Sequence, residues 1–369
     1  MDGIWITEVP ARGDGTRLAV KDLFDTAGVR TTYGSAVFAE HVPSSTAEAV
    51  LRLARAAYVN VGKANLHEFA YGVTSQNAHY GTVPNPRAPG RTAGGSSGGS
   101  AAAVVAGLAD VALGTDSGGS IRIPAACCGI VGFKPTYGLV STDGVFPLAP
   151  SFDHVGPIAS DVEGCDAMMR ALAPELARRT LESLEEVTVA VAWTAECDAV
   201  VRARVEAAAA LFPRRRAVAF PEAHGTSRAF MREVAEVHRE LYAEHAELYG
   251  ENVAPKIERC LTVTDAEAAA AAARREEYRE RADETLGEAD LLLTPTLMFV
   301  APPADVDEIA TREHFIRFTY PFDVLGWPAI ALPCGAAEAG LPASVQLAAR
   351  PGKDALVLAA AAALEAALR

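Results

Sequence analysis

Several features that would assign a chain to a simple class are missing from this sequence. Its 369 residues include six cysteines, and no two of them have the CxxC spacing of many metal and redox sites. We therefore expect buried free thiols in a reducing compartment rather than disulfides or a metal centre. The start of the chain lacks the basic and then apolar residues of a signal peptide, and no apolar run reaches the roughly 18 residues of a membrane span. We predict a cytoplasmic protein with no membrane partner.

Positive charge is also scarce. Lysine and arginine total 33 against 47 aspartate and glutamate residues, which gives a formal charge of −14. This excess of acidic groups argues against nucleic acid or an anionic membrane surface as a partner, and it favours a neutral or cationic small substrate. There is no Pro/Ser-rich spacer and no repeat of fixed period. We therefore predict one large domain.

The order of predicted elements indicates an α/β fold, with a central mixed sheet covered by helices on both faces. Strands are expected at 17–21, 58–63, 111–115, 188–193, 217–222, 290–296, 327–335 and 343–351, the last two as a pair. Helices are expected after a cap at Ser44, Ser45 or Thr46, after the glycines at 95–99, over 199–212, 226–249 and 265–287, and as an amphipathic closing helix over 354–369.

A glycine-rich stretch, "GTDSGGSIRIP" at 114–124, places Ser120 directly after two residues that have no side chain. Gly118 and Gly119 can adopt conformations closed to other residues and present N–H groups to a developing negative charge. The alternative is a tight turn that leads into a buried segment, because Ile121, Ile123 and Pro124 follow.

A second glycine-rich stretch, "GSSGG" at 95–99, matches the G-x-S-x-G elbow of α/β-hydrolases with Ser97 at its centre. That motif requires a preceding strand, but prolines and glycines interrupt residues 85–94. His314 is the only histidine after residue 245. Its charged helical context makes it a poor base for a catalytic triad. The stretch also matches neither of two phosphate-binding patterns, G-x-x-x-x-G-K and G-x-G-x-x-G after a strand.

A buried neutral lysine can replace the histidine as a base, with a second serine as proton relay. Lys21, Ser96 and Ser120 would supply these parts. They are far apart in the sequence, so their spacing alone does not bring them together.

Further motifs carry a resemblance. The stretches "AVKDLFDTAGVRTTYGS", "VGKANLHEFAYG", "NPRAPGRTAGGSSGGSAAAVVAG", "GTDSGGSIRIPAACCGIVGFKPTYG" and "DHVGPIA" follow one another through residues 17–162. Together they resemble the amidase signature family, and "WPAIALPCG" and "LPASVQLAARP" resemble its C-terminal pattern more loosely. The resemblance implies one amidase signature domain over 1–369, with a catalytic core at 17–162, a variable pocket region at 163–290 and C-terminal strands and a helix at 291–369.

The resemblance also implies roles for single residues. Ser120 falls on the family's nucleophile, Ser96 on its bridging serine and Lys21 on its base, and the Gly95–Ser96 peptide on a cis bond. The oxyanion hole of the family corresponds to the backbone N–H groups of Ser117, Gly118, Gly119 and Ser120. Ser97 either supports this network by hydrogen bonding or caps the following helix.

Other matching positions are expected to be structural. Asp116 and Arg122 are expected to pair across the second glycine loop, and Cys128 matches a structural cysteine. His67 and His79 are also expected to be structural, and the "PRRR" run that ends at Arg216 to be a solvated corner. Asp323 stands where the family usually has asparagine, which we interpret as structural drift.

The implied activity is hydrolysis of a small-molecule amide through an acyl-enzyme, without a cofactor. The alternative is the amidase-type subunit of an amidotransferase complex that supplies ammonia to a partner. A homodimer is one option for the assembly.

Overall fold

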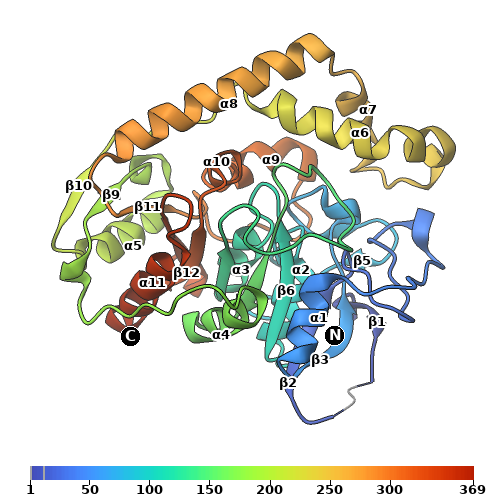
Figure 1. Ribbon diagram of the computed structural model, residues 1–369, viewed down its shortest axis with the longest axis horizontal. Coiled ribbons are helices and arrows are strands. Elements are labelled where there is room, and N and C mark those ends of the chain that lie inside the picture. Colours follow the sequence, from blue (N-terminus) through green and yellow to red (C-terminus); the bar gives the residue numbers. More distant parts are fainter. Residues whose placement is uncertain (1, 11–12) are drawn as a thin grey trace.

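The computed structural model describes residues 2–10 and 13–369, and its described part is built on one mixed sheet with strand order β1-β3-β2-β6-β8-β7-β12-β13-β11-β9-β10 (Figure 1). The strands are β1 (Trp5–Glu8), β2 (Thr16–Lys21), β3 (Tyr58–Ala64), β6 (Val111–Asp116), β7 (Val131–Lys134), β8 (His154–Ala159), β9 (Val189–Val191), β10 (Arg215–Ala217), β11 (Leu291–Pro295), β12 (Ala329–Ala336) and β13 (Pro342–Ala348). A separate short pair is formed by β4 (Gln76–Asn77) and β5 (Gly81–Thr82). The predicted α/β class is confirmed.

Helices cover both faces of this sheet. They are α1 (Glu48–Arg55), α2 (Gly98–Val105), α3 (Arg122–Cys128), α4 (Val162–Leu172), α5 (Ala199–Ala210), α6 (Ser227–His245), α7 (Ala254–Leu261), α8 (Asp265–Leu286), α9 (Glu308–Ile316), α10 (Tyr320–Leu325) and α11 (Asp354–Leu368). Alternate residues of β2 show the two faces: Leu18 and Val20 share a core with α1, α4, α5 and α11, whereas Ala19 lies in a core with α2 and α3.

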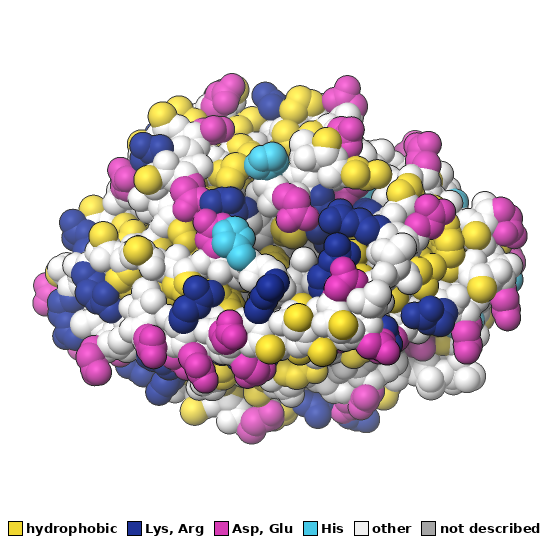
Figure 2. All heavy atoms as spheres, turned by 90° about the horizontal axis from the view of Figure 1, so that it is seen from above, with side chains coloured by type: hydrophobic (Ala, Val, Ile, Leu, Met, Phe, Trp, Pro, Cys, Tyr) yellow, Lys and Arg dark blue, Asp and Glu magenta, His cyan; other side chains and the backbone are white. Residues whose placement is uncertain are grey.

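The long helices α6 and α8 form an outer layer at the top of Figure 1. They share a core with α7 and with one face of the C-terminal strands. Seen from above, this side of the molecule carries acidic and basic side chains interspersed rather than a field of one sign (Figure 2). No helix in the described residues is both long and apolar enough to cross a membrane.

Strands β2 and β6 are parallel neighbours, and this pairing positions the candidate site. Their C-terminal ends therefore meet at one edge of the sheet, with Lys21 closing β2 and Asp116 closing β6. Helix α2 packs against them closely because it begins with glycines and alanines. A Cβ on Gly99 would lie 2.2 Å from the carbonyl oxygen of Asn65, so only glycine fits there.

Some local predictions are wrong. Helix α1 has Ala47 at its N-cap with no side-chain cap, and the Thr46 hydroxyl instead accepts a hydrogen bond from the Ala27 N–H. The strand expected at 217–222 ends at its first residue, because β10 is a short exposed segment paired with β9.

Two further elements add detail to the sequence analysis. The buried segment expected after Ser120 is helix α3, which starts where the Ile123 N–H donates to the Gly119 carbonyl. The closing helix α11 is buried around most of its first two turns, so it is amphipathic only toward its C-terminal end. The six cysteines are buried free thiols, as predicted.

Candidate active site

Lys21 lies at the centre of the candidate site. Its side chain is completely buried, and its Nζ lies 2.7 Å from Ser96 Oγ and 2.7 Å from Thr115 Oγ1. The fold thus brings Lys21 and Ser96 together across the β2–β6 edge, although the sequence separates them widely. Thr115, the penultimate residue of β6, is a partner that sequence reasoning missed.

The electrostatic setting of Lys21 suits a proton acceptor. Burial lowers the pKa of Lys21 to about 7, because removal from water penalises the charged ammonium, and the carboxylates of Asp116 and Asp153 oppose that effect. A lysine with a pKa near neutrality holds a substantial neutral fraction at physiological pH. Such an amine can take a proton from a neighbouring hydroxyl.

The two glycine loops that carry Ser96 and Ser120 are joined by a backbone hydrogen bond. The Gly95–Ser96 peptide bond is cis, and the Ser96 carbonyl accepts hydrogen bonds from the His67 N–H and the Ser75 hydroxyl. The Ser97 N–H donates to the Ser120 carbonyl at 3.3 Å. Ser120 is nearly buried, and in the described residues its hydroxyl has no hydrogen-bond partner. It is therefore available to a ligand.

Ser97 itself does not cap the following helix. It occupies the N-cap position of α2 without a side-chain cap, and its hydroxyl donates to the Thr115 carbonyl at 3.2 Å. Of the two alternatives for Ser97, the hydrogen-bonding one is present. This contact fixes the first glycine loop to the end of β6, next to Lys21.

The backbone of the second glycine loop is shaped by Asp116. Its carboxylate accepts from the N–H of Gly119 at 2.6 Å and of Ile121 at 3.1 Å. Gly119 has φ +128° and a Cβ there would lie 2.2 Å from Thr319 Oγ1, so both conformation and space require glycine. Because the Gly119 N–H is engaged by Asp116, the N–H groups of Gly118 and Ser120 are the better candidates for an oxyanion hole.

Arg122 ties this loop to the C-terminal half of the chain. Its guanidinium lies 2.9 Å from Asp116 Oδ1 and 2.7 Å from Asp323 Oδ2, all fully buried, and it also donates to the Thr319 carbonyl and to Gln346 Oε1. The expected Asp116–Arg122 pair is therefore present. Asp323 is a member of this buried ion-pair cluster, which corrects its interpretation as structural drift.

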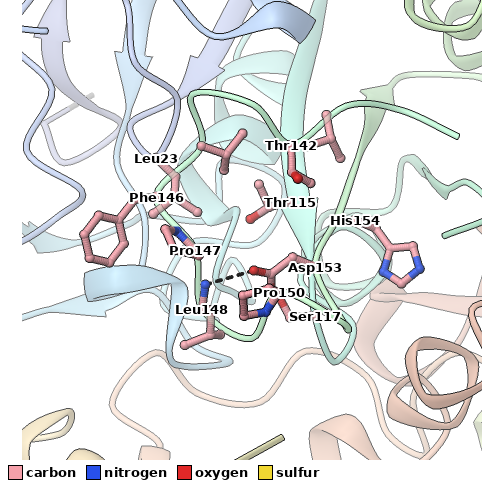
Figure 3. Close-up of a pocket in the computed structure, with 12 residues that line it drawn as sticks. Leu23, Thr115, Ser117, Thr142, Phe146, Pro147, Leu148, Pro150, Asp153 and His154 are labelled. Atoms are coloured by element: carbon pink, nitrogen blue, oxygen red, sulfur yellow. Dashed lines mark hydrogen bonds between the residues drawn. The ribbon is translucent and has the colours of Figure 1, made fainter. Parts of the chain in front are cut away.

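Asp153 holds two loops around the site (Figure 3). Its carboxylate accepts from the Ser117 hydroxyl at 2.6 Å and from the Leu148 N–H at 2.9 Å. Ser117 and Leu148 each line two pockets, one bordered by Thr115 and Phe146 and the other by Ser120. Asp153 therefore holds together Ser117 and Leu148, the two residues that line both pockets.

The pocket that reaches Ser120 is narrow, with a cavity volume of about 20 Å³. It is lined by Gly118 of the glycine loop, by Tyr71, Phe230 and Tyr320, and by Arg312 of α9. Phe230 comes from α6, within the region 163–290 that was expected to border the substrate pocket.

The remaining singled-out residues lie outside this pocket. His67 is buried with its Nε2 at 3.2 Å from Asn252, and His79 contacts Glu68. Cys128 is buried in α3, and its thiol faces the Ala93 carbonyl. Arg214, Arg215 and Arg216 are exposed; Arg214 directly precedes β10, and Arg215 and Arg216 are its first two residues.

Comparison with known proteins places this geometry in a family. The sequence profile described as Amidase matches residues 14–196 and 175–358. The chain belongs to the amidase family. It is 35% identical to AtzE, a component of 1-carboxybiuret hydrolase from Pseudomonas sp. (strain ADP), over 93% of this chain and 82% of that protein. A solved structure described as "Crystal structure of amidase" superposes with a TM-score of 0.88 at 37% identity, over 96% of this chain and 85% of the other.

Another relative matches the chain over a shorter stretch. A glutamyl-tRNA(Gln) amidotransferase subunit of Haloarcula marismortui is 53% identical over 159 residues, which is 43% of this chain and 37% of that protein. The matched stretch therefore spans little more than a third of this relative.

Removal of the Asp116 carboxylate should destabilise this family member strongly. In Asp116→Ala, the buried Arg122 loses one of its two carboxylates and the glycine loop loses its acceptor, so we expect the free energy of unfolding to fall by about 3–5 kcal/mol. Urea denaturation measures this change. Asp110→Ala is the matched control: its partner Arg17 is largely solvated, and the loss should stay near 1 kcal/mol or below. Equal losses in the two variants would contradict this account.

Proposed function

We propose that this protein is an amidohydrolase that cleaves the C–N bond of a small-molecule amide, with Ser120 as nucleophile, Ser96 as proton relay and Lys21 as base. The observation that carries the proposal is the 2.7 Å contact between the buried Lys21 Nζ and Ser96 Oγ. Membership of the amidase family supports the same reaction class.

The proposed steps follow from these positions. Neutral Lys21 takes the proton of Ser96 as Ser96 takes that of Ser120, and Ser120 Oγ bonds to the amide carbonyl carbon. The resulting oxyanion is held by backbone N–H groups of the glycine loop. The relay returns the proton to the nitrogen, the C–N bond breaks, and ammonia or an amine leaves. Water then attacks the acyl-enzyme through the same relay and releases a carboxylic acid.

A panel of amides tests this function. Aryl, acyl, ureido and amino-acid amides are incubated with the purified protein, and the carboxylic acid and the amine or ammonia are detected by mass spectrometry and an ammonia assay. We expect at least one class to give both products in equal amounts. Failure of every class, together with no labelling by a fluorophosphonate probe, would overturn the proposal.

A second candidate function is the amidase-type subunit of an amidotransferase complex. It is favoured by the name of the Haloarcula relative, an amidotransferase subunit. The name of AtzE, a hydrolase subunit, supports a partner protein but not this reaction. Affinity purification of the tagged chain from its native host distinguishes the two functions. A stoichiometric partner that is required for amide cleavage would favour the complex.

Activity is expected to survive metal removal. In the proposed mechanism the base, the relay and the nucleophile are all side chains of this chain, and the oxyanion is held by backbone N–H groups. Prolonged dialysis against EDTA and 1,10-phenanthroline should therefore leave the rate of amide cleavage within error of the untreated enzyme. Loss of activity that zinc or manganese restores would show that a metal takes part.

A further inference from the structure

We propose that Arg312 is the specificity residue of the Ser120 pocket and binds a carboxylate carried by the amide substrate. This inference rests on the proposed function and adds a substrate class to it. Arg312 lines the same pocket as Ser120 and Gly118, so an anion bound there belongs to the molecule whose carbonyl faces Ser120.

The guanidinium of Arg312 is almost unused by the protein. Within the described residues, its only hydrogen bond is a 3.5 Å contact with Glu313, whose side chain is 81% exposed, and its buried Nε has no partner. The Arg312 side chain as a whole is 22% exposed, whereas in the buried Arg122 and Arg275 all three guanidinium nitrogens donate hydrogen bonds. A buried donor without a partner is costly, which indicates a ligand as its partner.

The expected intramolecular partner of Arg312 is occupied elsewhere. Glu308 lies one helical turn before Arg312 on α9, where an ion pair is ordinarily formed. Its carboxylate instead lies 3.1 Å from Lys256 Nζ and accepts from the Val73 N–H and the Thr74 hydroxyl. Glu308 and Lys256 pair with each other, which leaves the exposed Glu313 as the only described ion-pair partner of Arg312, the one charged side chain in the lining of the pocket.

The orientation of Arg312 is fixed by an aromatic ring. Its guanidinium carbon lies 5.4 Å from the centroid of Tyr71, which also lines the pocket. A planar guanidinium held in this way can form two parallel hydrogen bonds with a carboxylate. The positive charge of Arg312 in the pocket is opposite in sign to the chain's net charge of −14. That net charge led us to expect a neutral or cationic substrate, whereas Arg312 favours an anionic one.

A pair of matched substrates tests the inference. Succinamate carries a carboxylate beyond its amide, and its methyl ester is the neutral counterpart of similar shape. We expect the wild-type protein to favour succinamate in kcat/KM. Arg312→Gln should lose roughly 10- to 100-fold on succinamate, mainly through KM, because a hydrogen-bonded charge partner is removed. The same variant should cleave the amide bond of the methyl ester substrate at the wild-type rate.

Two further variants keep the result interpretable. Arg312→Lys retains the charge without the planar fork and should fall between wild type and Arg312→Gln. Arg317→Gln removes an arginine that pairs with Glu196 and Glu222 at the surface, and it should behave like wild type on both substrates. Thermal melting checks that each variant is folded.

Binding separates this inference from the proposed function. Calorimetric titration of Ser120→Ala with succinate should show binding that the double variant with Arg312→Gln lacks. Equal loss on both substrates, or succinate binding that persists without Arg312, would overturn the carboxylate subsite while leaving amide hydrolysis standing. Failure of both substrates and of the whole amide panel would instead count against the proposed function.

Discussion

Replacement of Lys21 by alanine is expected to lower kcat/KM on any accepted amide by about a thousandfold or more. The buried Lys21 Nζ is at hydrogen-bond distance from both Ser96 and Thr115, and no other described group is placed to take the proton of Ser96. When base, relay and nucleophile act as one unit, loss of one member removes most of the catalysis. Steady-state kinetics of the purified variant measure the effect.

The pH profile gives an independent readout of the same role. Burial lowers the pKa of Lys21 to about 7, and the neutral amine is the active form. Activity should fall about tenfold per pH unit below 7, rise through 7 and level off above it. Lys21→Arg keeps a positive charge but cannot be neutral in this range, so it should be as inactive as Lys21→Ala. High activity in Lys21→Arg would mean that Lys21 only holds the loop by its charge.

The second large effect is expected at Ser120. A fluorophosphonate probe should label the wild-type protein at Ser120, and Ser120→Ala should lose both labelling and turnover, the latter by on the order of 10⁴-fold or more. Within the described chain, the Ser120 hydroxyl makes no hydrogen bond, so the variant should fold and melt like the wild type. Peptide mapping of the labelled protein identifies the site.

Ser97→Ala is the matched control for Ser120→Ala. The Ser97 hydroxyl donates only to the Thr115 carbonyl, so its loss should reduce turnover modestly and leave labelling of Ser120 intact. Labelling at Ser97 that persists in Ser120→Ala would support the α/β-hydrolase elbow instead, and the proposed roles would have to be reassigned.

Sequence reasoning worked where short-range pattern decides structure. The apolar runs at 17–21 and 111–115 predicted β2 and β6, and the small residues after Gly98 predicted α2. It left the type of the buried element after Ser120 open, because a short apolar run fits a strand and a buried helix equally well, and the structure has helix α3 there. It also misplaced the cap of α1, since Thr46 binds the Ala27 N–H across a loop.

The candidate site depends on contacts that no local pattern contains. The prediction that Lys21 and Ser96 act together came from the family resemblance. Sequence spacing alone does not tell which strand ends are neighbours in the sheet. Asp323 and Arg312 were not recognised: their significance comes from buried partners, present for Asp323 and missing for Arg312. Only the three-dimensional arrangement distinguishes these residues from surface charges.

The hydrogen bonds and the ion pair that join Arg122 to the C-terminal half of the chain have a consequence for its synthesis on the ribosome. Lys21, Ser96 and Ser120 have all been made by the time one third of the protein has emerged. The groups that anchor Arg122 from the other half, Thr319, Asp323 and Gln346, are added more than 190 residues later. Until then the loop around Ser120 has Asp116 but lacks these three anchors, so we expect a nascent chain with every reactive side chain in place to be inactive.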